Sequence, residues 1–289
     1  MKIVEEAKSK INISLNLTGK KEDNFHDLVS FICFGNFSDK LILTESDFFD
    51  YKIESSFEKI PHQNDLIIKT IDSVKNYLKL SDLPPFRLIL EKNIPIGSGL
   101  GGGSADSAAL IRLLNKFLKL NLSSNDMINI GSKLGSDIPA CIISKPLISF
   151  GRGDKIIELN FKNTYDILII YPSINISTKE IFSLINSRDF KNIDPITIKD
   201  WINNNSNLSG DKFFKKFNND LKKTVIKKHP VIIEILDFLN FKNAFFSGIS
   251  GSGSACFGIF ESKDIVEAKV YFEKKFPHWI IEKTKLNDF

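Results

Sequence analysis

Glycine is unevenly distributed along this chain, and two short clusters of it constrain the fold more than any other feature. The 289 residues include only 16 glycines, of which five lie between Gly97 and Gly103 and four between Gly248 and Gly258. Glycine adopts left-handed backbone conformations freely and lets a backbone approach a ligand closely. Two dense clusters in a glycine-poor chain therefore predict two loops with a defined geometric task.

The first cluster lies between a strand that we expect at 87–91 and a helix that we expect at 104–118. Its glycines let several backbone N–H groups turn inward, and the helix start adds unpaired N–H groups and the positive end of a dipole. These features predict a phosphate cradle, with Ser104 as the helix N-cap or as a hydroxyl on phosphate or its magnesium. A flexible turn that only needs positive φ is the alternative. The cluster reads Pro95-Ile96-Gly97-Ser98-Gly99-Leu100-Gly101-Gly102-Gly103-Ser104-Ala105.

Three familiar phosphate loops do not fit this cluster. The Walker A pattern ends in Gly-Lys-Ser/Thr, whereas here Ser104 follows Gly103 directly. Gly97-x-Gly99-x-x-Gly102 matches the dinucleotide fingerprint, but that fold also needs an acid ~20 residues later, and 118–122 contain none. The His-Arg-Asp and Asp-Phe-Gly motifs of protein kinases do not occur in the sequence.

The second cluster, Gly248-Ile249-Ser250-Gly251-Ser252-Gly253-Ser254-Ala255, precedes an apolar segment that we expect to be a strand. By itself it is typical of a bulge or a tight strand entry. If the first cluster is a phosphate loop, an equally good interpretation of the second is a backbone surface that contacts a polyanion or a substrate.

Asp137 and Lys10 are candidates for the chemistry of phosphoryl transfer, which needs a positioned carboxylate and a cation near the transferring group. Asp137 lies in a Gly-Ser-Asp-Ile-Pro turn, where an isolated Asp usually forms the turn or caps a helix. Lys10 begins the polar face of the alternating segment 10–17, and such a lysine is usually solvated. Spacing alone does not show that the two side chains meet.

Hydrophobic periodicity predicts a mixed α+β chain, because strands and helices follow one another without regular βαβ alternation. We expect a domain boundary near 150–165, a turn at 35–39 and a loop at 135–139. Strands are expected at 10–17, 28–34, 40–45, 87–91, 141–143, 147–150, 165–171, 255–260 and 279–284. Helices are expected at 65–80, 104–118, 125–134, 229–239 and 264–276, and helices with loops at 174–229.

Composition narrows the class of protein. A formal net charge of +4 on this length argues against a nucleic-acid or membrane-surface protein and leaves an anionic small substrate possible. Cys33, Cys141 and Cys256 are far apart and form no ligand cluster, which favours reduced structural thiols. The N-terminus lacks an apolar signal region, and no apolar run approaches the ~20 residues of a membrane span. We therefore expect a cytoplasmic protein.

Together these motifs resemble those of the GHMP kinases. Pro-x-Gly-x-Gly-Leu-Gly-Gly-Gly-Ser at 95–104 is similar to their phosphate-binding motif, and Gly-x-Ser-Gly-Ser-Gly at 248–253 to their C-terminal glycine motif. Segments 10–19 and 23–26 (Asp-Asn-Phe-His) resemble one branch, which uses ATP to phosphorylate the 2-hydroxyl of a cytidine diphosphate-linked methylerythritol in the non-mevalonate isoprenoid pathway. The resemblance extends from about Lys8 to the last strand.

The resemblance implies a two-lobed fold, with a lobe like domain 2 of ribosomal protein S5 over residues 1–160 and a ferredoxin-like α/β lobe over 161–289. It implies ATP with Mg²⁺ as phosphate donor, a small-molecule substrate, and a monomer or weak homodimer. Asp137 matches the catalytic base and Lys10 the lysine that orients the hydroxyl. The matching ATP contacts are Pro95 to Ala105, Asp65, Leu66 and Lys92; the matching substrate contacts are Asn12, Phe25, His26, Phe182, Gly251 and Ser252.

Some positions depart from the family pattern. Phe25 replaces the usual tyrosine and so loses a hydroxyl donor, and Ala105 stands where a second serine is common, so the metal ligands are left unassigned. The adenine-side Asn-Leu of the family reads Asp65-Leu66 here. Another GHMP kinase of the homoserine or mevalonate type, a non-catalytic nucleotide sensor and a dehydrogenase remain as alternatives.

Overall fold

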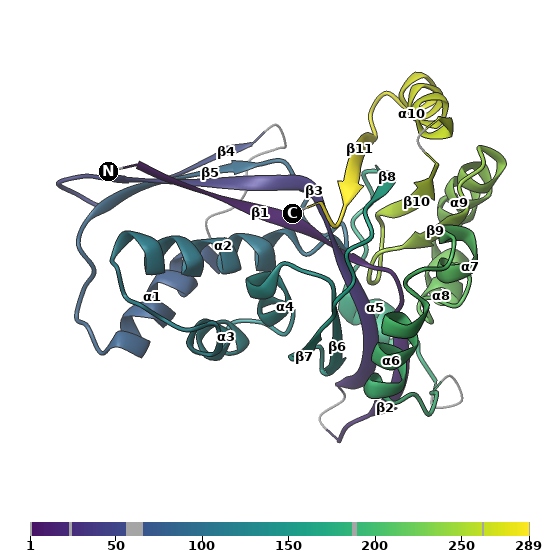
Figure 1. Cartoon of the computed structure of the whole chain (residues 1–289). Helices are drawn as coiled ribbons and strands as arrows, with labels where there is room; N and C mark the ends of the chain where they lie inside the picture. The colour runs from purple at the N-terminus through teal and green to yellow at the C-terminus, as the bar shows by residue number, and fades with distance from the viewer. Residues whose placement is uncertain (1, 23–24, 56–65, 187–189, 262, 289) are drawn as a thin grey trace.

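Two long antiparallel strands, β1 (Lys2–Asn12) and β3 (His26–Glu45), run through the molecule side by side (Figure 1). The computed structural model describes residues 2–22, 25–55, 66–186, 190–261 and 263–288. The shorter β2 (Asn16–Lys20) pairs with the start of β3, and β11 (Ile280–Leu286) meets β3 at Gly35. Because β3 pairs with strands from both ends of the chain, it is the central strand of the fold.

The described strands form one 11-stranded sheet, whose main path runs β4-β5-β3-β11-β8-β10-β9. All of its pairs are antiparallel except β4 with β5. The remaining strands are β4 (Asp50–Ser55), β5 (Phe86–Lys92), β6 (Leu147–Gly151), β7 (Lys155–Glu158), β8 (Tyr165–Tyr171), β9 (Phe246–Ile249) and β10 (Cys256–Phe260).

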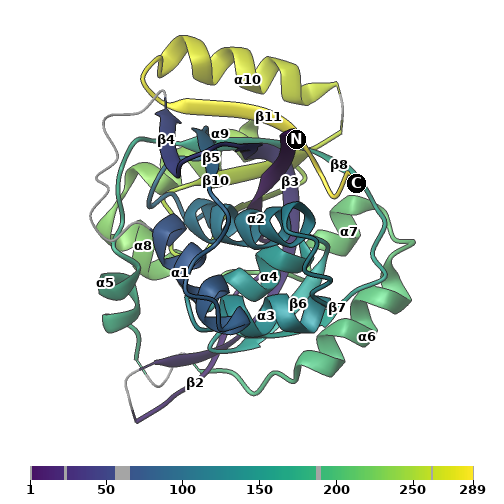
Figure 2. The ribbon, with the colours of Figure 1, turned by 90° about the vertical axis from the view of Figure 1, so that its left-hand side faces the viewer.

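The helices form two groups along this sheet. Figure 2 shows the first group gathered in front of the N-terminal strands, whereas most of the second group lies toward the C-terminal strands in Figure 1. The first group is α1 (Leu66–Leu78), α2 (Gly102–Phe117), α3 (Ser124–Ser132) and α4 (Ile138–Ile143). The second is α5 (Thr178–Ser183), α6 (Pro195–Asn205), α7 (Gly210–Phe214), α8 (Lys222–Lys228), α9 (Val231–Phe241) and α10 (Asp264–Lys275).

Three clusters of buried apolar side chains stabilise this arrangement. One packs α1 to α4 on β1, β3 and β5, and another packs α5, α8, α9 and α10 on the C-terminal strands. The third is shared: Phe31 of β3 contacts Phe161, Phe213 and Phe217, with ring centroids 5.2 to 6.4 Å apart. The two ends of the sheet are therefore joined by a common core.

The structure confirms the α+β class and each helix that periodicity predicted, within two or three residues at the ends. The predicted strands at 87–91, 147–150, 165–171, 255–260 and 279–284 also form. The prediction missed β4, although Tyr51 and Ile53 alternate there with polar residues, and it missed β7 and β9, which are four residues long and do not alternate.

Four local predictions were wrong. The turn expected at 35–39 is instead part of β3, because a bulge opposite Lys8 and Ser9 accommodates the turn residues without breaking the strand. The strand expected at 10–17 breaks after Asn12, where Ser14 Oγ accepts the backbone N–H of Phe31.

The loop at 135–139 and the strand at 141–143 are corrected together. Helix α4 begins at Ile138 with Pro139 in its first turn, so the apolar run that follows is helical. Pro is favoured at this end of a helix, and a short apolar run does not by itself distinguish a buried helix from a strand.

The cysteines fit the prediction of structural thiols, since all three are free and buried. Burial, with Asp137 nearby, raises the pKa of the Cys141 thiol to about 12. Among the described residues no helix is both long enough and apolar enough to cross a bilayer.

Candidate active site

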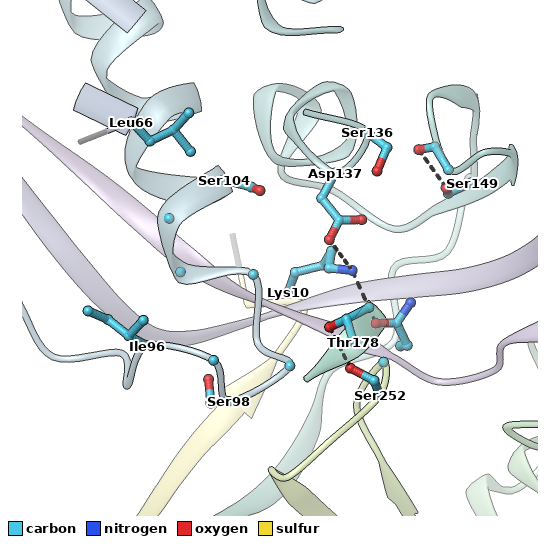
Figure 3. A pocket seen from close by; sticks show the side chains of 18 of the residues that line it. Lys10, Leu66, Ile96, Ser98, Ser104, Ser136, Asp137, Ser149, Thr178 and Ser252 are labelled. Carbon is cyan, nitrogen blue, oxygen red and sulfur yellow. Dashed lines mark hydrogen bonds and ion pairs between the residues drawn. The ribbon is translucent and has the colours of Figure 1, made fainter. Parts of the chain in front are cut away.

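A cavity of about 1210 Å³ lies between the N-terminal helices and the C-terminal elements (Figure 3). Most single-ligand pockets measure about 300–1,000 Å³, so this cavity is larger than most of them. Of the residues predicted for the site, those in its wall are Lys10, Asn12, Phe25, His26, Leu66, Lys92, Pro95, Ile96, Gly97, Ser98, Gly99, Gly101, Gly102, Gly103, Ser104, Asp137, Phe182, Gly251 and Ser252.

Three of the residues predicted for the site are not found in the cavity wall. Leu100 and Ala105 are 1% and 2% exposed, belong to the hydrophobic core beneath the loop and do not line the cavity. Asp65 lies outside the described residues. Leu66, the next residue, begins α1 and reaches the cavity wall.

The first glycine cluster forms a loop whose backbone is held in left-handed conformations at Gly97, Gly99 and Gly101, with φ of +70°, +83° and +69°. The loop ends at Gly101, which is the N-cap of α2. Ser104 is therefore inside the first turn, and the prediction that it caps the helix was wrong, because the glycine before the helix takes that position. Its hydroxyl instead lines the cavity beside the N-terminus of α2, as an anion-binding loop requires (Figure 3).

The second glycine cluster packs directly against the first. The Ala255 N–H donates to the Ser98 carbonyl at 2.8 Å, and a Cβ on Gly99 would lie 2.3 Å from the Ser250 carbonyl oxygen. Gly251 and Ser252 reach the cavity, where Ser252 Oγ lies 2.8 Å from Thr178 Oγ1 (Figure 3). The cluster is thus a partner surface of the phosphate loop as well as the entry to β10.

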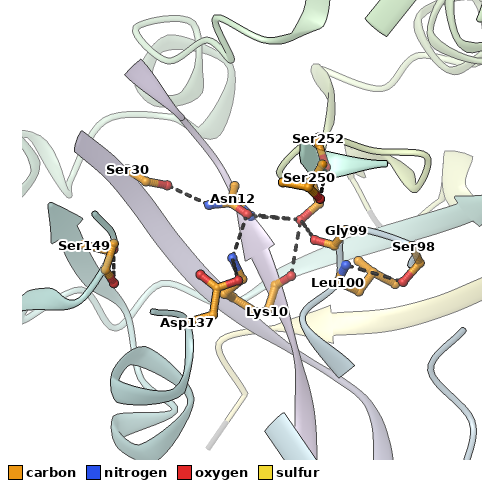
Figure 4. Close-up of polar contacts among 12 residues, drawn as sticks. Lys10, Asn12, Ser30, Ser98, Gly99, Leu100, Asp137, Ser149, Ser250 and Ser252 are labelled. Carbon is orange, nitrogen blue, oxygen red and sulfur yellow. Dashed lines mark hydrogen bonds and ion pairs between the residues drawn. The ribbon is translucent and has the colours of Figure 1, made fainter. Parts of the chain in front are cut away.

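Ser250 joins both clusters to β1 (Figure 4). Its buried hydroxyl lies 2.9 Å from the Gly99 carbonyl and 3.2 Å from the Lys10 carbonyl, and it accepts the N–H of Asn12 at 3.2 Å. Sequence analysis did not single out this serine, because nothing in a Gly-Ser run distinguishes a structural hydroxyl from an exposed one.

Lys10 and Asp137 meet at the centre of the cavity, with Lys10 Nζ 3.1 Å from Asp137 Oδ2. The lysine side chain is 5% exposed, whereas the aspartate is 40% exposed and so can reach a ligand. Lys10 Nζ also donates to Asn12 Oδ1 at 3.2 Å, and Asn12 Nδ2 donates to Ser30 Oγ at 2.7 Å (Figure 4). The chain thus presents a carboxylate with a fixed ammonium beside the phosphate loop.

Aromatic side chains line the far end of the cavity. Phe25 is 57% exposed, and the rings of His26 and Phe182 are 5.2 Å apart. His26 Nε2 is buried and has no hydrogen-bond partner among the described residues. Burial and the nearby Lys20 lower the pKa of His26, which favours a neutral imidazole that can bind a polar ring. This end suits a flat heterocycle with polar edges.

Arg152 is a residue of this wall that sequence analysis missed. It lies in the β6–β7 turn between Gly151 and Gly153, which have φ of +68° and +97°. Its guanidinium carbon stands 4.7 Å from the centre of the Phe25 ring, at the distance of a cation–π contact. The Gly-Arg-Gly turn that directly follows a predicted strand is the local sequence pattern from which Arg152 could have been identified.

Comparison with known proteins shows which family this chain resembles. Residues 65–145 match the model of the GHMP kinases N terminal domain, and residues 188–278 match the model of the GHMP kinases C terminal domain. A 4-diphosphocytidyl-2-C-methyl-D-erythritol kinase of Thermodesulfovibrio yellowstonii is 33% identical over 93% of this chain and 93% of that protein. One of Prochlorococcus marinus is also 33% identical, over 94% of this chain and 90% of that protein.

Solved structures show the same fold. A 4-(cytidine 5'-diphospho)-2C-methyl-D-erythritol kinase superposes with a TM-score of 0.81 at 19% identity and covers 99% of this chain and 100% of that one. The mevalonate kinase of Methanococcus jannaschii gives a TM-score of 0.71 at 16% identity, over 100% of this chain and 98% of that one.

Proposed function

The chain belongs to the 4-diphosphocytidyl-2-C-methyl-D-erythritol kinase family of the GHMP kinases, and we propose that it transfers the γ-phosphoryl group of ATP to the 2-hydroxyl of that cytidyl substrate. The observation that carries the proposal is the Lys10–Asp137 pair, 3.1 Å apart, in a cavity walled by both glycine clusters. The reaction is the step expected in the non-mevalonate route to isoprenoid precursors.

In this reaction Asp137 accepts the proton of the substrate 2-hydroxyl. The freed oxygen forms a bond to the γ-phosphorus, while the bond from that phosphorus to the β–γ bridging oxygen breaks and ADP leaves with the electron pair. Lys10 orients the hydroxyl and offsets the negative charge that develops, and its own position is fixed by Asn12 and by near-complete burial. Because phosphoryl transfer depends mainly on positioning and charge, two side chains beside a backbone cradle are sufficient.

The phosphates of ATP fit the backbone of 95–105 and the N-terminus of α2, with Leu66 and Lys92 on the side of the adenine. Mg²⁺, when bound, neutralises the phosphates and helps to align them. No group of three or more His, Cys, Asp or Glu side chains forms a metal site among the described residues. Such an ion would take most of its ligands from phosphate and water, and the Ser104 hydroxyl in the cavity wall could supply a protein oxygen.

The cytosine of the substrate fits between Phe25 and Phe182, with His26 Nε2 as a hydrogen-bond partner that the protein itself leaves unsatisfied. Phe25 provides a stacking face without the hydroxyl that the family usually has there. The catalytic and binding roles of all these residues are part of the proposal.

The proposal is tested with a coupled assay of ADP release that uses ATP and the cytidyl substrate. Asp137→Asn retains the shape of the side chain but cannot accept the proton, so turnover should fall by about 10²–10⁴-fold. Binding of ADP, measured by calorimetry, should remain close to that of the wild type. Wild-type protein that binds ADP but does not phosphorylate the cytidyl substrate would contradict the specific assignment.

The same assay separates the alternatives. Turnover of homoserine or mevalonate in preference to the cytidyl substrate would favour another GHMP kinase, and binding without turnover would favour a nucleotide sensor. Thermal stabilisation by NAD would favour a dehydrogenase. A cytoplasmic location, a monomer or weak dimer, and the lack of nucleic-acid and membrane partners remain predictions from the sequence.

A further inference from the structure

A buried charge cluster lies directly beneath the phosphate loop and consists of Asp39, Lys92 and Asp106. These residues come from β3, from the end of β5 and from α2, and they are 0%, 4% and 3% exposed. Lys92 Nζ pairs with Asp39 Oδ2 and lies 3.0 Å from Asp106 Oδ2. Charged groups this deeply buried are costly unless they are paired, and an apolar core of the same volume is often at least as stable. Stability alone therefore does not account for the cluster.

The cluster fixes both ends of the phosphate loop. At the entry, Asp39 Oδ1 accepts the backbone N–H groups of Asn93 and Ile94, at 2.5 and 2.7 Å, immediately before Pro95. At the exit, Asp106 lies in the second turn of α2 and is held by Lys92. One carboxylate and one ammonium thus connect the two segments between which the loop is suspended.

The first residue of α2, Gly102, also lies close to the ammonium. A Cβ added at Gly102 would lie 2.8 Å from Lys92 Nζ and 3.0 Å from Ile94 Cγ2. The glycine is needed here for close packing on the cluster, since its φ is not left-handed. Lys92 is thus linked to α2 by its ion pair with Asp106 and by this close packing at Gly102.

The charges within the cluster are uneven, with two carboxylates and one ammonium. Burial, with Asp39 nearby, raises the pKa of Asp106 well above its usual range, although Lys92 acts in the opposite direction. Asp39 pairs with Lys92 and also accepts the backbone N–H groups of Asn93 and Ile94, so it contacts both the ammonium and the loop entry. Asp39 is therefore the carboxylate on which the geometry depends.

We propose that Asp39 is a positioning residue for ATP: through Lys92 and the N–H groups of Asn93 and Ile94, it holds both ends of the phosphate loop in the geometry that receives the nucleotide. Asp39 is absent from the cavity wall and acts only through other groups. The inference rests on the proposed function only in naming ATP as the ligand of the loop.

Asp39→Asn tests this inference. The amide oxygen can still accept the backbone N–H groups, but the charge that holds Lys92 is lost. We expect the dissociation constant of ADP, measured by calorimetry without the acceptor substrate, to rise about tenfold, which corresponds to about 1.4 kcal/mol. In turnover assays the KM for ATP should rise by a similar factor, while the KM for the cytidyl substrate stays within about twofold.

Asp166→Asn is the matched control. Asp166 is also a buried strand carboxylate, 6% exposed and 2.8 Å from Lys285, but it is not part of the cavity wall. It should lower the melting temperature without changing ADP affinity. Asp39→Asn with wild-type ADP affinity would overturn the proposal and leave the cluster a purely structural role. Because ADP binding is measured without substrate, this result is independent of which acceptor the enzyme uses.

If Asp39→Asn does not fold, Asp39→Glu takes its place. Glutamate retains the charge but is one methylene longer, so Lys92 and the loop entry must shift. ADP affinity should weaken in the same direction, and unchanged affinity in this folded variant would equally overturn the proposal.

Discussion

At the scale of single residues, Arg152 provides a test of the cytosine end of the cavity. Its guanidinium lies over the ring of Phe25, and both side chains line the cavity. A cation–π contact at an exposed ring contributes about 0.5–1 kcal/mol. Arg152→Ala should therefore raise the KM for the cytidyl substrate about two- to fivefold, or more if the guanidinium also meets the diphosphate, and leave the KM for ATP unchanged.

Lys155→Ala is the control for this prediction. It removes a cation from the same hairpin, but Lys155 stands over Phe150 and is absent from the cavity wall. Steady-state kinetics with each substrate varied in turn makes the comparison. Equal KM values for the cytidyl substrate in Arg152→Ala and Lys155→Ala would argue against a role for Arg152 in substrate binding.

At the scale of elements, the packing of the two glycine clusters predicts which glycines are irreplaceable. Gly99 has a φ of +83°, and a Cβ there would lie 2.3 Å from the Ser250 carbonyl oxygen and 2.8 Å from that of Gly253. Neither oxygen belongs to a flexible side chain, so Gly99→Ala should cost at least about 1–3 kcal/mol of unfolding free energy in urea titrations.

Gly103→Ala, in the first turn of α2, is the comparison within the same glycine cluster. Gly103 has no left-handed φ, and the nearest atom to its added Cβ is Leu66 Cδ2 at 3.8 Å. Alanine is also about 1 kcal/mol better than glycine in a helix, so Gly103→Ala should be neutral or stabilising in the same titration. Similar losses in both variants would show that the steric argument at Gly99 is wrong.

The elements also show which parts of the fold could be predicted from the sequence. Long amphipathic helices and the two glycine clusters were predicted because periodicity and glycine density are local signals. The β3 bulge and α4 were missed because their conformation depends on partners distant in sequence. The bulge lies opposite β1, and α4 packs on α2, where Arg112 donates to the carbonyl of Cys141 in α4. For the same reason spacing could not place Lys10 beside Asp137.

The candidate site likewise contains residues that the sequence could identify and residues that it could not. The residue types of the loop and of Phe25-His26 were visible in the sequence, and the family resemblance suggested their roles. Asp39, by contrast, looked like the end of a turn, and its task depends on Lys92 and Asp106, which lie more than fifty residues away. Residues that act through others leave no local pattern.

At the scale of the whole molecule, the two predicted lobes share a core, and this determines how they unfold. Phe31 of β3 is fully buried and contacts Phe161, Phe213 and Phe217 from beyond the proposed boundary at 160/161. The sheet also continues from one lobe to the other where Leu286 pairs with Gly35. Neither lobe can expose this shared surface without losing a large part of its buried apolar area.

We therefore expect one cooperative unfolding transition. Fluorescence of Trp201 and Trp279, which both lie in the C-terminal lobe, should change at the same urea concentration as the far-UV circular dichroism of the whole chain. Phe31→Ala should cost about 3–5 kcal/mol, as should Phe86→Ala, which removes an equally buried ring from the N-terminal core alone. Because Phe31 joins the lobes, only its loss should separate the fluorescence and dichroism midpoints. Separate midpoints already in the wild type would mean that the lobes fold independently and that the shared core does not couple them.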